Sequence, residues 1–152
     1  MEVTRNAIDR ILKRYERDRR HALAMMQDMQ RQFQYIPREG MEMLADYLEC
    51  PEAQLYAMAT FYKALSLKPK GKHIIKCCDG TACHIRGSLS LIGEIKRQIG
   101  IEPGETTADG TFSFETVNCV GSCALAPVLI VDDTYYGKVT MDSIGEILAK
   151  YN

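Results

Sequence analysis

The sequence lacks long apolar runs, nucleotide-binding loops and a strong excess of charge of one sign. Its apolar runs are only a few residues long, as in 127–131 (PVLIV), whereas a membrane-spanning helix needs about 20 residues. The first residues, MEVTRNAIDR, contain no apolar stretch behind a basic region, so we expect no secretory signal and a cytoplasmic location. No G-x-G-x-x-G motif follows a predicted strand and no Walker loop is present, so we expect no nucleotide site in this chain.

Charge is nearly balanced overall but unevenly distributed. The net charge is −1, with nine Lys or Arg and six Asp or Glu in residues 1–40 but two and eight, respectively, in residues 100–152. Such a polarised chain suits docking to a charged partner. Nucleic acid is a poor candidate, because basic residues are mixed with acidic ones and the overall charge is close to zero. The 152 residues allow one domain or two small ones.

The informative residues are the six cysteines, Cys50, Cys77, Cys78, Cys83, Cys119 and Cys123. Disulfides are disfavoured because they belong to oxidising compartments, and no export signal is expected. Clustered cysteines in a cytoplasmic chain are more often metal ligands or redox groups. The first cysteine pair, Cys78 and Cys83, forms a C-x4-C motif, and the second cysteine pair, Cys119 and Cys123, forms a C-x3-C motif.

Both cysteine pairs are predicted to lie in loops beside strands. Residues 72–78 read as a short strand that enters a glycine-containing loop, and residues 128–132 read as another strand after Pro127. Backbone N–H groups at such strand ends are free to point at bound sulfur. Gly80 and Gly121 lie inside the two loops and allow the close backbone approach that a metal cluster requires.

Four thiolates from two loops fit three chemistries. A structural zinc ion takes four cysteine thiolates, but its pairs are usually spaced C-x2-C. A thiol–disulfide oxidoreductase would need C-x-x-C, which is absent. A [2Fe–2S] core needs ligands set further apart, and the plant-type ferredoxin loop also begins with C-x4-C. Rieske ligation needs two histidines near the ligand cysteines, and only His84 adjoins one. The spacing therefore favours a [2Fe–2S] cluster, with a zinc-stabilised structural adaptor as the alternative.

The remaining two cysteines are expected to play no part in the site. Cys77 and Cys78 are adjacent and point to opposite faces of the predicted strand. Cys77 continues the side of His73 and Ile75, which indicates a small buried hydrophobe, while Cys78 completes the C-x4-C motif. Cys50 stands just before a proline and is also interpreted as a buried thiol.

Helical periodicity runs through about the first seventy residues. Apolar residues recur at helical spacing in 8–15 and 23–33, and Pro37 and Pro51 open two further amphipathic segments. We expect a small helical bundle whose methionines fill the core, with a groove that faces a partner as the alternative. The basic run at 17–21 is predicted to be a solvated helix face, with a docking surface as the alternative. Residues 67–72, which contain a proline and a glycine, form the natural boundary.

Beyond the boundary the pattern changes to mixed strands and helices. Residues 72–78, 111–117, 128–132 and 135–138 are predicted strands. A helix is expected over 88–98, and Thr140 is placed to cap a last helix. The order β-α-β-β-β-α indicates an open α/β sandwich of thioredoxin-like type. The Asp132–Asp133 pair is interpreted as turn chemistry and not as an acid–base site.

Four ordered motifs resemble those of a known family. They are residues 59–62 (ATFY), 78–83 (CDGTAC) with Gly87 and Ser88 behind it, 104–110 (GETTADG) and 119–127 (CVGSCALAP). Together they resemble the small [2Fe–2S] subunit of NADH dehydrogenases (the E-subunit type of complex I), which recurs in NAD-linked hydrogenases, including electron-bifurcating ones, and in NAD-dependent formate dehydrogenases. The resemblance covers nearly the whole chain.

The resemblance implies an α + α/β architecture. A small N-terminal helical bundle (1–70) would be followed by a thioredoxin-like [2Fe–2S] ferredoxin domain (71–152). It also implies one [2Fe–2S] cluster held by Cys78, Cys83, Cys119 and Cys123.

The same resemblance implies an electron-transfer subunit with no catalytic residue or substrate site of its own. Its expected partner is a larger flavoprotein subunit that binds FMN, NADH and a [4Fe–4S] cluster. That partner would belong to a hydrogenase, NADH dehydrogenase or formate dehydrogenase assembly. The chain would not insert into a membrane, although a parent complex could hold it at the inner face.

Overall fold

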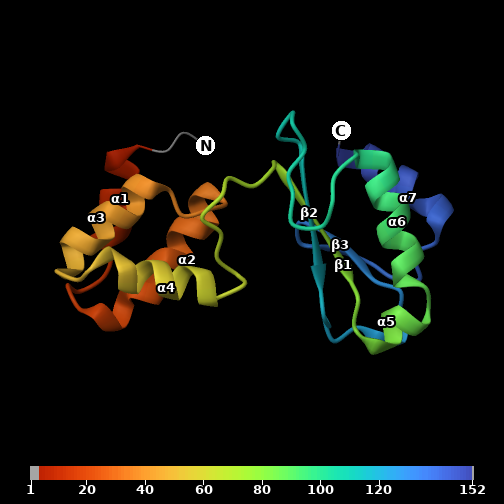
Figure 1. Ribbon diagram of the computed structural model, residues 1–152, viewed down its shortest axis with the longest axis horizontal. Helices are drawn as coiled ribbons and strands as arrows, with labels where there is room; N and C mark the ends of the chain where they lie inside the picture. Colours follow the sequence, from red (N-terminus) through yellow and green to blue (C-terminus); the bar gives the residue numbers. More distant parts are fainter. Residues whose placement is uncertain (1–3, 152) are drawn as a thin grey trace. The chain divides into compact units, whose positions relative to one another are not determined.

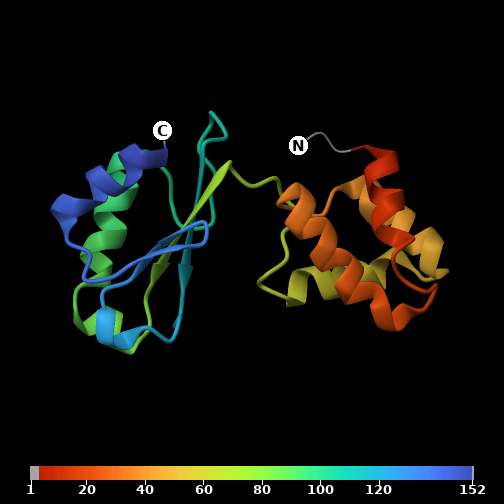
Figure 2. The ribbon, with the colours of Figure 1, turned by 180° about the vertical axis from the view of Figure 1, so that it is seen from behind.

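A computed structural model describes residues 4–151 of the chain (Figures 1 and 2). The chain divides into two compact units, Met1–Pro69 and Lys70–Asn152, each with its own apolar core. None of the helices formed by residues 4–151 combines the length and apolar character needed to cross a membrane.

The N-terminal unit is helical throughout. Its helices are α1 (Arg5–Leu12), α2 (Ala22–Phe33), α3 (Arg38–Leu48) and α4 (Glu52–Phe61), and a 3₁₀ turn, η1 (Arg19–His21), precedes α2. The predicted helix starts are confirmed, since Pro37 and Pro51 are the N-cap residues of α3 and α4. The expected methionine core is also confirmed, because four methionines are almost completely buried, namely Met25, Met26, Met29 and Met41.

The three arginines of the basic run at 17–21 are exposed, as predicted, but Arg17 lies in a loop and the others lie in η1, so they do not form the face of an α-helix. The Arg17 guanidinium donates to the carbonyl oxygens of Tyr47 and Asp46, and the Arg19 guanidinium donates to that of Glu49 at 2.6 Å. These carbonyls lie at the C-terminal end of α3, where the helix dipole favours a cation; the Asp46 carbonyl also accepts from the N–H of Glu49 at 3.3 Å. The two arginines therefore cap α3 from a segment about thirty residues earlier in the chain.

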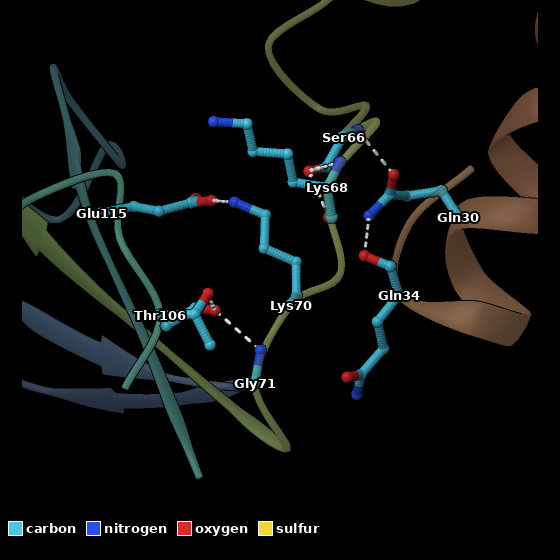
Figure 3. A network of polar contacts seen from close by, with 9 residues as sticks. Gln30, Gln34, Ser66, Lys68, Lys70, Gly71, Thr106 and Glu115 are labelled. Carbon is cyan, nitrogen blue, oxygen red and sulfur yellow. Dashed lines mark hydrogen bonds and ion pairs between the residues drawn. The ribbon is translucent and has the colours of Figure 1, made fainter. Parts of the chain in front are cut away.

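The segment that joins the two units is held at each end by hydrogen bonds within its own unit (Figure 3). In the N-terminal unit, Gln30 accepts from the backbone N–H of Ser66 at 2.7 Å and donates to the Gln34 carbonyl oxygen at 2.5 Å. In the C-terminal unit, Lys70 forms an ion pair with Glu115, and the N–H of Gly71 donates to the hydroxyl of Ser113 at 2.7 Å. These contacts attach Ser66 to the N-terminal unit and Lys70 and Gly71 to the C-terminal unit.

The C-terminal unit contains a four-stranded mixed sheet. Its strands are β1 (His73–Cys78), β2 (Phe112–Val117), β3 (Leu129–Val131) and β4 (Thr134–Tyr136), in the spatial order β2-β1-β3-β4. The β1–β2 pair is parallel, whereas the β1–β3 and β3–β4 pairs are antiparallel. The four predicted strands are confirmed, although the last one ends earlier than expected.

Helices cover one face of this sheet. The connection from β1 to β2 contains α5 (Thr81–Ile85) and α6 (Ser88–Ile99), and α7 (Met141–Leu148) follows β4 with Thr140 as its N-cap. Helices α6 and α7 lie side by side on the same side of the sheet in both views (Figures 1 and 2). Apolar residues of both helices pack against alternate residues of the strands, among them Ile75, Cys77, Phe114 and Leu129.

A second, smaller apolar core lies on the other side of β1. It consists of Cys78, Cys83, Ala126, Val128 and Ile130. Because successive residues of a strand point to opposite faces, the adjacent Cys77 and Cys78 contribute to different cores. The sheet register therefore separates the two thiols, and only one of them faces the second core.

Candidate functional site

The first cysteine pair lies where β1 passes into α5. Cys78 is the last residue of β1, and its N–H donates to the Val128 carbonyl oxygen at 3.0 Å. Cys83 lies inside α5 and not in a loop as predicted, and both thiols are buried. A helix of five residues is too short to produce a recognisable apolar periodicity, so the sequence pattern did not indicate it.

The second cysteine pair lies between β2 and β3, where Cys119 is in a loop, as predicted, and Cys123 begins a 3₁₀ turn, η2 (Cys123–Leu125). The Sγ atoms of Cys119 and Cys123 are 3.8 Å apart, and both residues are exposed. The N–H of Gly121 donates to Cys119 Sγ at 3.4 Å. Gly121 has φ +78°, a conformation that favours glycine, whereas a Cβ atom placed on it would meet no other described atom within 4 Å.

The two cysteine loops touch at Gly80. A Cβ atom placed on Gly80 would lie 2.0 Å from the Asn118 carbonyl oxygen and 3.2 Å from the Cβ of Cys119. The thiol of Cys78 also lies 3.8 Å from the Asn118 carbonyl oxygen. The close approach predicted for Gly80 is therefore confirmed, and its neighbour is the backbone of the other cysteine loop. An open hollow of about 720 Å³ lies at this junction and is lined by Asp79, Gly80, Thr81, Ala82, Ile85, Asn118, Cys119 and Cys123.

The thiols influence one another electrostatically. Burial raises the pKa of Cys83, and the neighbouring Cys78 raises it further, while a backbone hydrogen bond from Val128 lowers it. The hydrogen bond and charge of Cys119 raise the pKa of Cys123, and Cys78 adds to this effect. Crowded thiolates repel one another, and a positively charged metal core relieves that repulsion. Cys83 thus interacts with Cys78, and Cys123 interacts with Cys119 and Cys78; a donor set of four such thiols fits an iron–sulfur cluster. Among residues 4–151, no three His, Cys, Asp or Glu side chains are grouped so as to hold a single metal ion.

The other two cysteines lie outside this site. Cys77 is fully buried in the core between the sheet and helices α6 and α7, as predicted, and burial raises its pKa to about 12. A thiol with that pKa stays protonated at neutral pH and is a poor ligand or nucleophile. Cys50 lies in the N-terminal unit, where it is partly buried against the helical core.

The contacts among Asp79, His84 and Ser88, beside the first cysteine pair, were not predicted from the sequence. The carboxylate of Asp79 accepts hydrogen bonds from the hydroxyl of Ser88 at 2.6 Å and from His84 at 2.9 Å. The hydrogen bond from Ser88, followed by that from His84, lowers the pKa of Asp79. The only available signal was the placement of an Asp directly after a predicted strand. The interpretation of Asp132 as a turn residue is confirmed, because it has φ +55° and its carboxylate accepts from the N–H of Ile74.

Exposed apolar side chains lie close to the site in the chain. Ile85 follows Cys83 by two residues and is 79% exposed, Leu89 is 57% exposed, and Leu125 follows Cys123 by two residues and is 48% exposed. Ile85 also lines the hollow beside the second cysteine pair, and an exposed large apolar side chain next to a site is typical of a surface that meets another protein.

Known proteins match most of this chain. The family model for thioredoxin-like [2Fe-2S] ferredoxins matches residues 8–152. Over 131 residues the chain is 40% identical to HndA, a subunit of the NADP-reducing hydrogenase of Solidesulfovibrio fructosivorans, and the match covers 86% of this chain and 77% of that protein. Over 150 residues it is 35% identical to the E subunit of the NADH-quinone oxidoreductase of Pseudomonas aeruginosa, and the match covers 99% of this chain and 90% of that protein.

A solved structure has the same fold. The chain aligns with an NAD+-reducing [NiFe]-hydrogenase in its H2-reduced state with a TM-score of 0.74 and 20% identity. The alignment covers 90% of this chain but 23% of the hydrogenase chain, so this chain spans less than a quarter of that protein's length. Together with the sequence matches, this confirms the predicted fold class and the predicted family. The chain belongs to the thioredoxin-like [2Fe-2S] ferredoxin family.

Proposed function

We propose that this chain binds one [2Fe–2S] cluster through Cys78, Cys83, Cys119 and Cys123 and carries single electrons. The observation that supports this most strongly is the meeting of the two cysteine loops at Gly80, where the backbone of one loop lies against the backbone of the other. The hollow at this contact is lined by Cys119 and Cys123 and by residues 79–82, which lie in the chain between Cys78 and Cys83. Membership of a [2Fe-2S] ferredoxin family supports the same cofactor.

The residues around the four sulfurs have separate tasks in this proposal. A bound [2Fe–2S] cluster would supply reversible one-electron transfer. Ala126, Val128 and Ile130 surround the first cysteine pair with apolar groups and keep water from it. The N–H of Gly121 donates to Cys119 Sγ and stabilises negative charge on that sulfur. The exposed second cysteine pair leaves one side of the site open to an electron-transfer partner.

The proposed partner is a flavoprotein subunit that binds FMN, NADH and further iron–sulfur clusters. Relatives that match most of the chain are named as subunits of an NADP-reducing hydrogenase and of an NADH-quinone oxidoreductase. The exposed side chains of Ile85, Leu89 and Leu125 would give that partner an apolar surface beside the site. A hydrogenase, an NADH dehydrogenase or a formate dehydrogenase could be the parent complex, at a cytoplasmic location.

Metal analysis tests the cofactor directly. The chain is purified without oxygen, iron, zinc and acid-labile sulfide are counted, and EPR spectra are recorded before and after dithionite. We expect red-brown protein with two irons and two sulfides per chain and an S = 1/2 signal that appears only on reduction, as a cluster of this type requires. A colourless chain with one zinc ion would contradict the proposal and favour a structural adaptor.

Single cysteine substitutions test the ligands. We expect Cys83→Ser and Cys119→Ser to lose the cluster or alter the EPR signal. The adjacent Cys77→Ala variant is the matched control and should keep the wild-type signal, because Cys77 faces the other core. An unchanged signal in either serine variant would remove that cysteine from the ligand set.

We also propose that residues 1–70 and 71–152 are separate domains. The separate apolar cores of the two units support this division. Limited proteolysis of the full chain should cleave first between about residues 66 and 72 and leave two resistant fragments. Early cleavage inside either unit would argue against two domains.

A further inference from the structure

Asp79 connects three segments of the chain beside the first cysteine pair. A single carboxylate oxygen, Oδ1, accepts from the hydroxyl of Ser88 at 2.6 Å and from Nδ1 of His84 at 2.9 Å. The backbone N–H of Asp79 donates to the Val117 carbonyl oxygen at 2.7 Å, which fixes the residue at the end of the sheet. Because an ionised carboxylate only accepts, Nδ1 of His84 carries the proton in this contact.

Asp79 and its partner His84 are each next to one member of the first cysteine pair in the chain. Asp79 directly follows Cys78, and His84 directly follows Cys83 in α5. Ser88 is the first residue of α6 and is fully buried, so its hydroxyl is shielded from water. A helix as short as α5 has little stability of its own, so its placement depends on such tertiary contacts. Hydrogen bonds to one carboxylate oxygen thus connect the end of β1, which carries Cys78, to α5, which carries Cys83.

The carboxylate also brings a fixed charge to the site. An aspartate carboxyl group is negatively charged at neutral pH, and that of Asp79 accepts two hydrogen bonds from Ser88 and His84. Asp79 lines the same hollow as the second cysteine pair. A negative charge next to a centre that gains an electron disfavours the reduced state.

We propose that Asp79 is a positioning residue of the cysteine site, which holds Cys78 and Cys83 in place for the cluster and lowers the reduction potential through its charge. Only the effect of Asp79 on the reduction potential rests on the proposed function. Placement of α5 is a property of the chain itself, whereas the potential requires the cluster.

Two substitutions separate orientation from charge. Asp79→Asn keeps a hydrogen-bond acceptor and removes the charge, whereas Asp79→Ala removes both. Glu94→Gln is the matched control, because it also removes one negative charge from the C-terminal unit, where Glu94 pairs with Arg97 on α6 and does not line the hollow.

The experiment has two readouts. Hydrogen–deuterium exchange of residues 81–85 is measured in the metal-free chain, and the midpoint potential is measured after loading with ferrous iron and sulfide. We expect Asp79→Ala to exchange faster in α5, while Asp79→Asn and Glu94→Gln exchange as the wild type does. We expect Asp79→Asn to have a more positive potential than the wild type, and Glu94→Gln to keep the wild-type potential.

Each part of the proposal can be overturned separately. Wild-type exchange in Asp79→Ala would overturn the positioning role. A potential of Asp79→Asn that is not raised, or is raised equally by Glu94→Gln, would overturn the role of the charge. A wild-type chain that takes up no iron would overturn the proposed function and with it the role in the potential, and the exchange data would still decide the positioning role.

Discussion

Replacement of Gly80 by alanine tests whether close contact between the two cysteine loops is needed for the site. Gly80 has φ −65° and ψ 161°, which alanine adopts without strain, so the substitution changes only the space available. The added Cβ would lie 2.0 Å from the Asn118 carbonyl oxygen, closer than the 3.0 Å below which real Cβ contacts are essentially never found. The loops must therefore move apart by about 1 Å or more.

A displacement of that size has two consequences. Overpacking of this kind costs about 1–3 kcal/mol of stability, which a small domain can tolerate. Bound metal is affected more severely, because ligands must be held within about 0.5 Å of their working geometry. We therefore expect Gly80→Ala to remain folded but to lose most of its iron and its reduced EPR signal.

The matched control for this experiment is Gly93→Ala. Gly93 lies inside α6, and a Cβ placed on it meets no atom within 4 Å. Alanine there should stabilise the helix by about 0.5–1 kcal/mol and leave the metal content unchanged. Iron, sulfide and unfolding by urea are measured on both variants. A Gly80→Ala protein that binds iron with the wild-type spectrum would refute the argument that loop contact sets the ligand geometry.

Three further outcomes are expected from the structure. Arg17→Ala should lower the free energy of unfolding by about 1 kcal/mol in urea titrations, because α3 loses hydrogen bonds at its C-terminal carbonyls; Arg5→Ala, which loses only an exposed ion pair, should change it by less than about 0.5 kcal/mol, and equal effects would contradict the capping role. The free energy of unfolding of Cys77→Ser, measured in urea, should be about 1–3 kcal/mol lower than that of Cys77→Ala, because the serine hydroxyl is buried in an apolar core. Equal stability of the two variants would argue against that burial. Hydrogen bonds from Thr107 and Thr111 lower the pKa of Asp109 to about 2, so its contribution to stability is present above about pH 4 and is lost as the pH falls towards 2; melting temperatures of the metal-free wild type and Asp109→Asn should differ above pH 4 and converge near pH 2, and a constant difference would refute the role of the charge.

Sequence reasoning predicted those parts of the molecule that depend on local pattern. Proline positions and apolar spacing located α3 and α4, and β-branched runs located the strands. Each of these signals is produced by residues that are close together in the sequence. The two cysteine pairs were recognisable for the same reason, since C-x4-C and C-x3-C are short-range motifs. The side of β1 that Cys77 occupies followed from the alternation of a strand alone.

The features that were missed depend on residues distant in sequence or on very short elements. Arg17 and Arg19 bind carbonyl oxygens about thirty residues away, and carbonyl groups are the same in every residue and leave no mark in a sequence. The five residues of α5 are too few for a periodic signal. The contact between Gly80 and Asn118 was predicted only as a need for space, because the sequence does not say which backbone will occupy it.

The neighbouring thiols at the end of β1 make the choice of ligand a question of strand alignment. If β1 slipped by one residue against both β2 and β3, Cys77 would take the place of Cys78 and a sulfur atom would still face the site. Sulfur chemistry alone would not disfavour such a misfolded sheet. The slip would, however, move Lys76 into the position of Cys77, where no water reaches, and an unpaired ammonium group there is far too costly. Lys76 does not line the hollow, yet the cost of burying it disfavours the misaligned sheet in which Cys77 would face the site in place of Cys78.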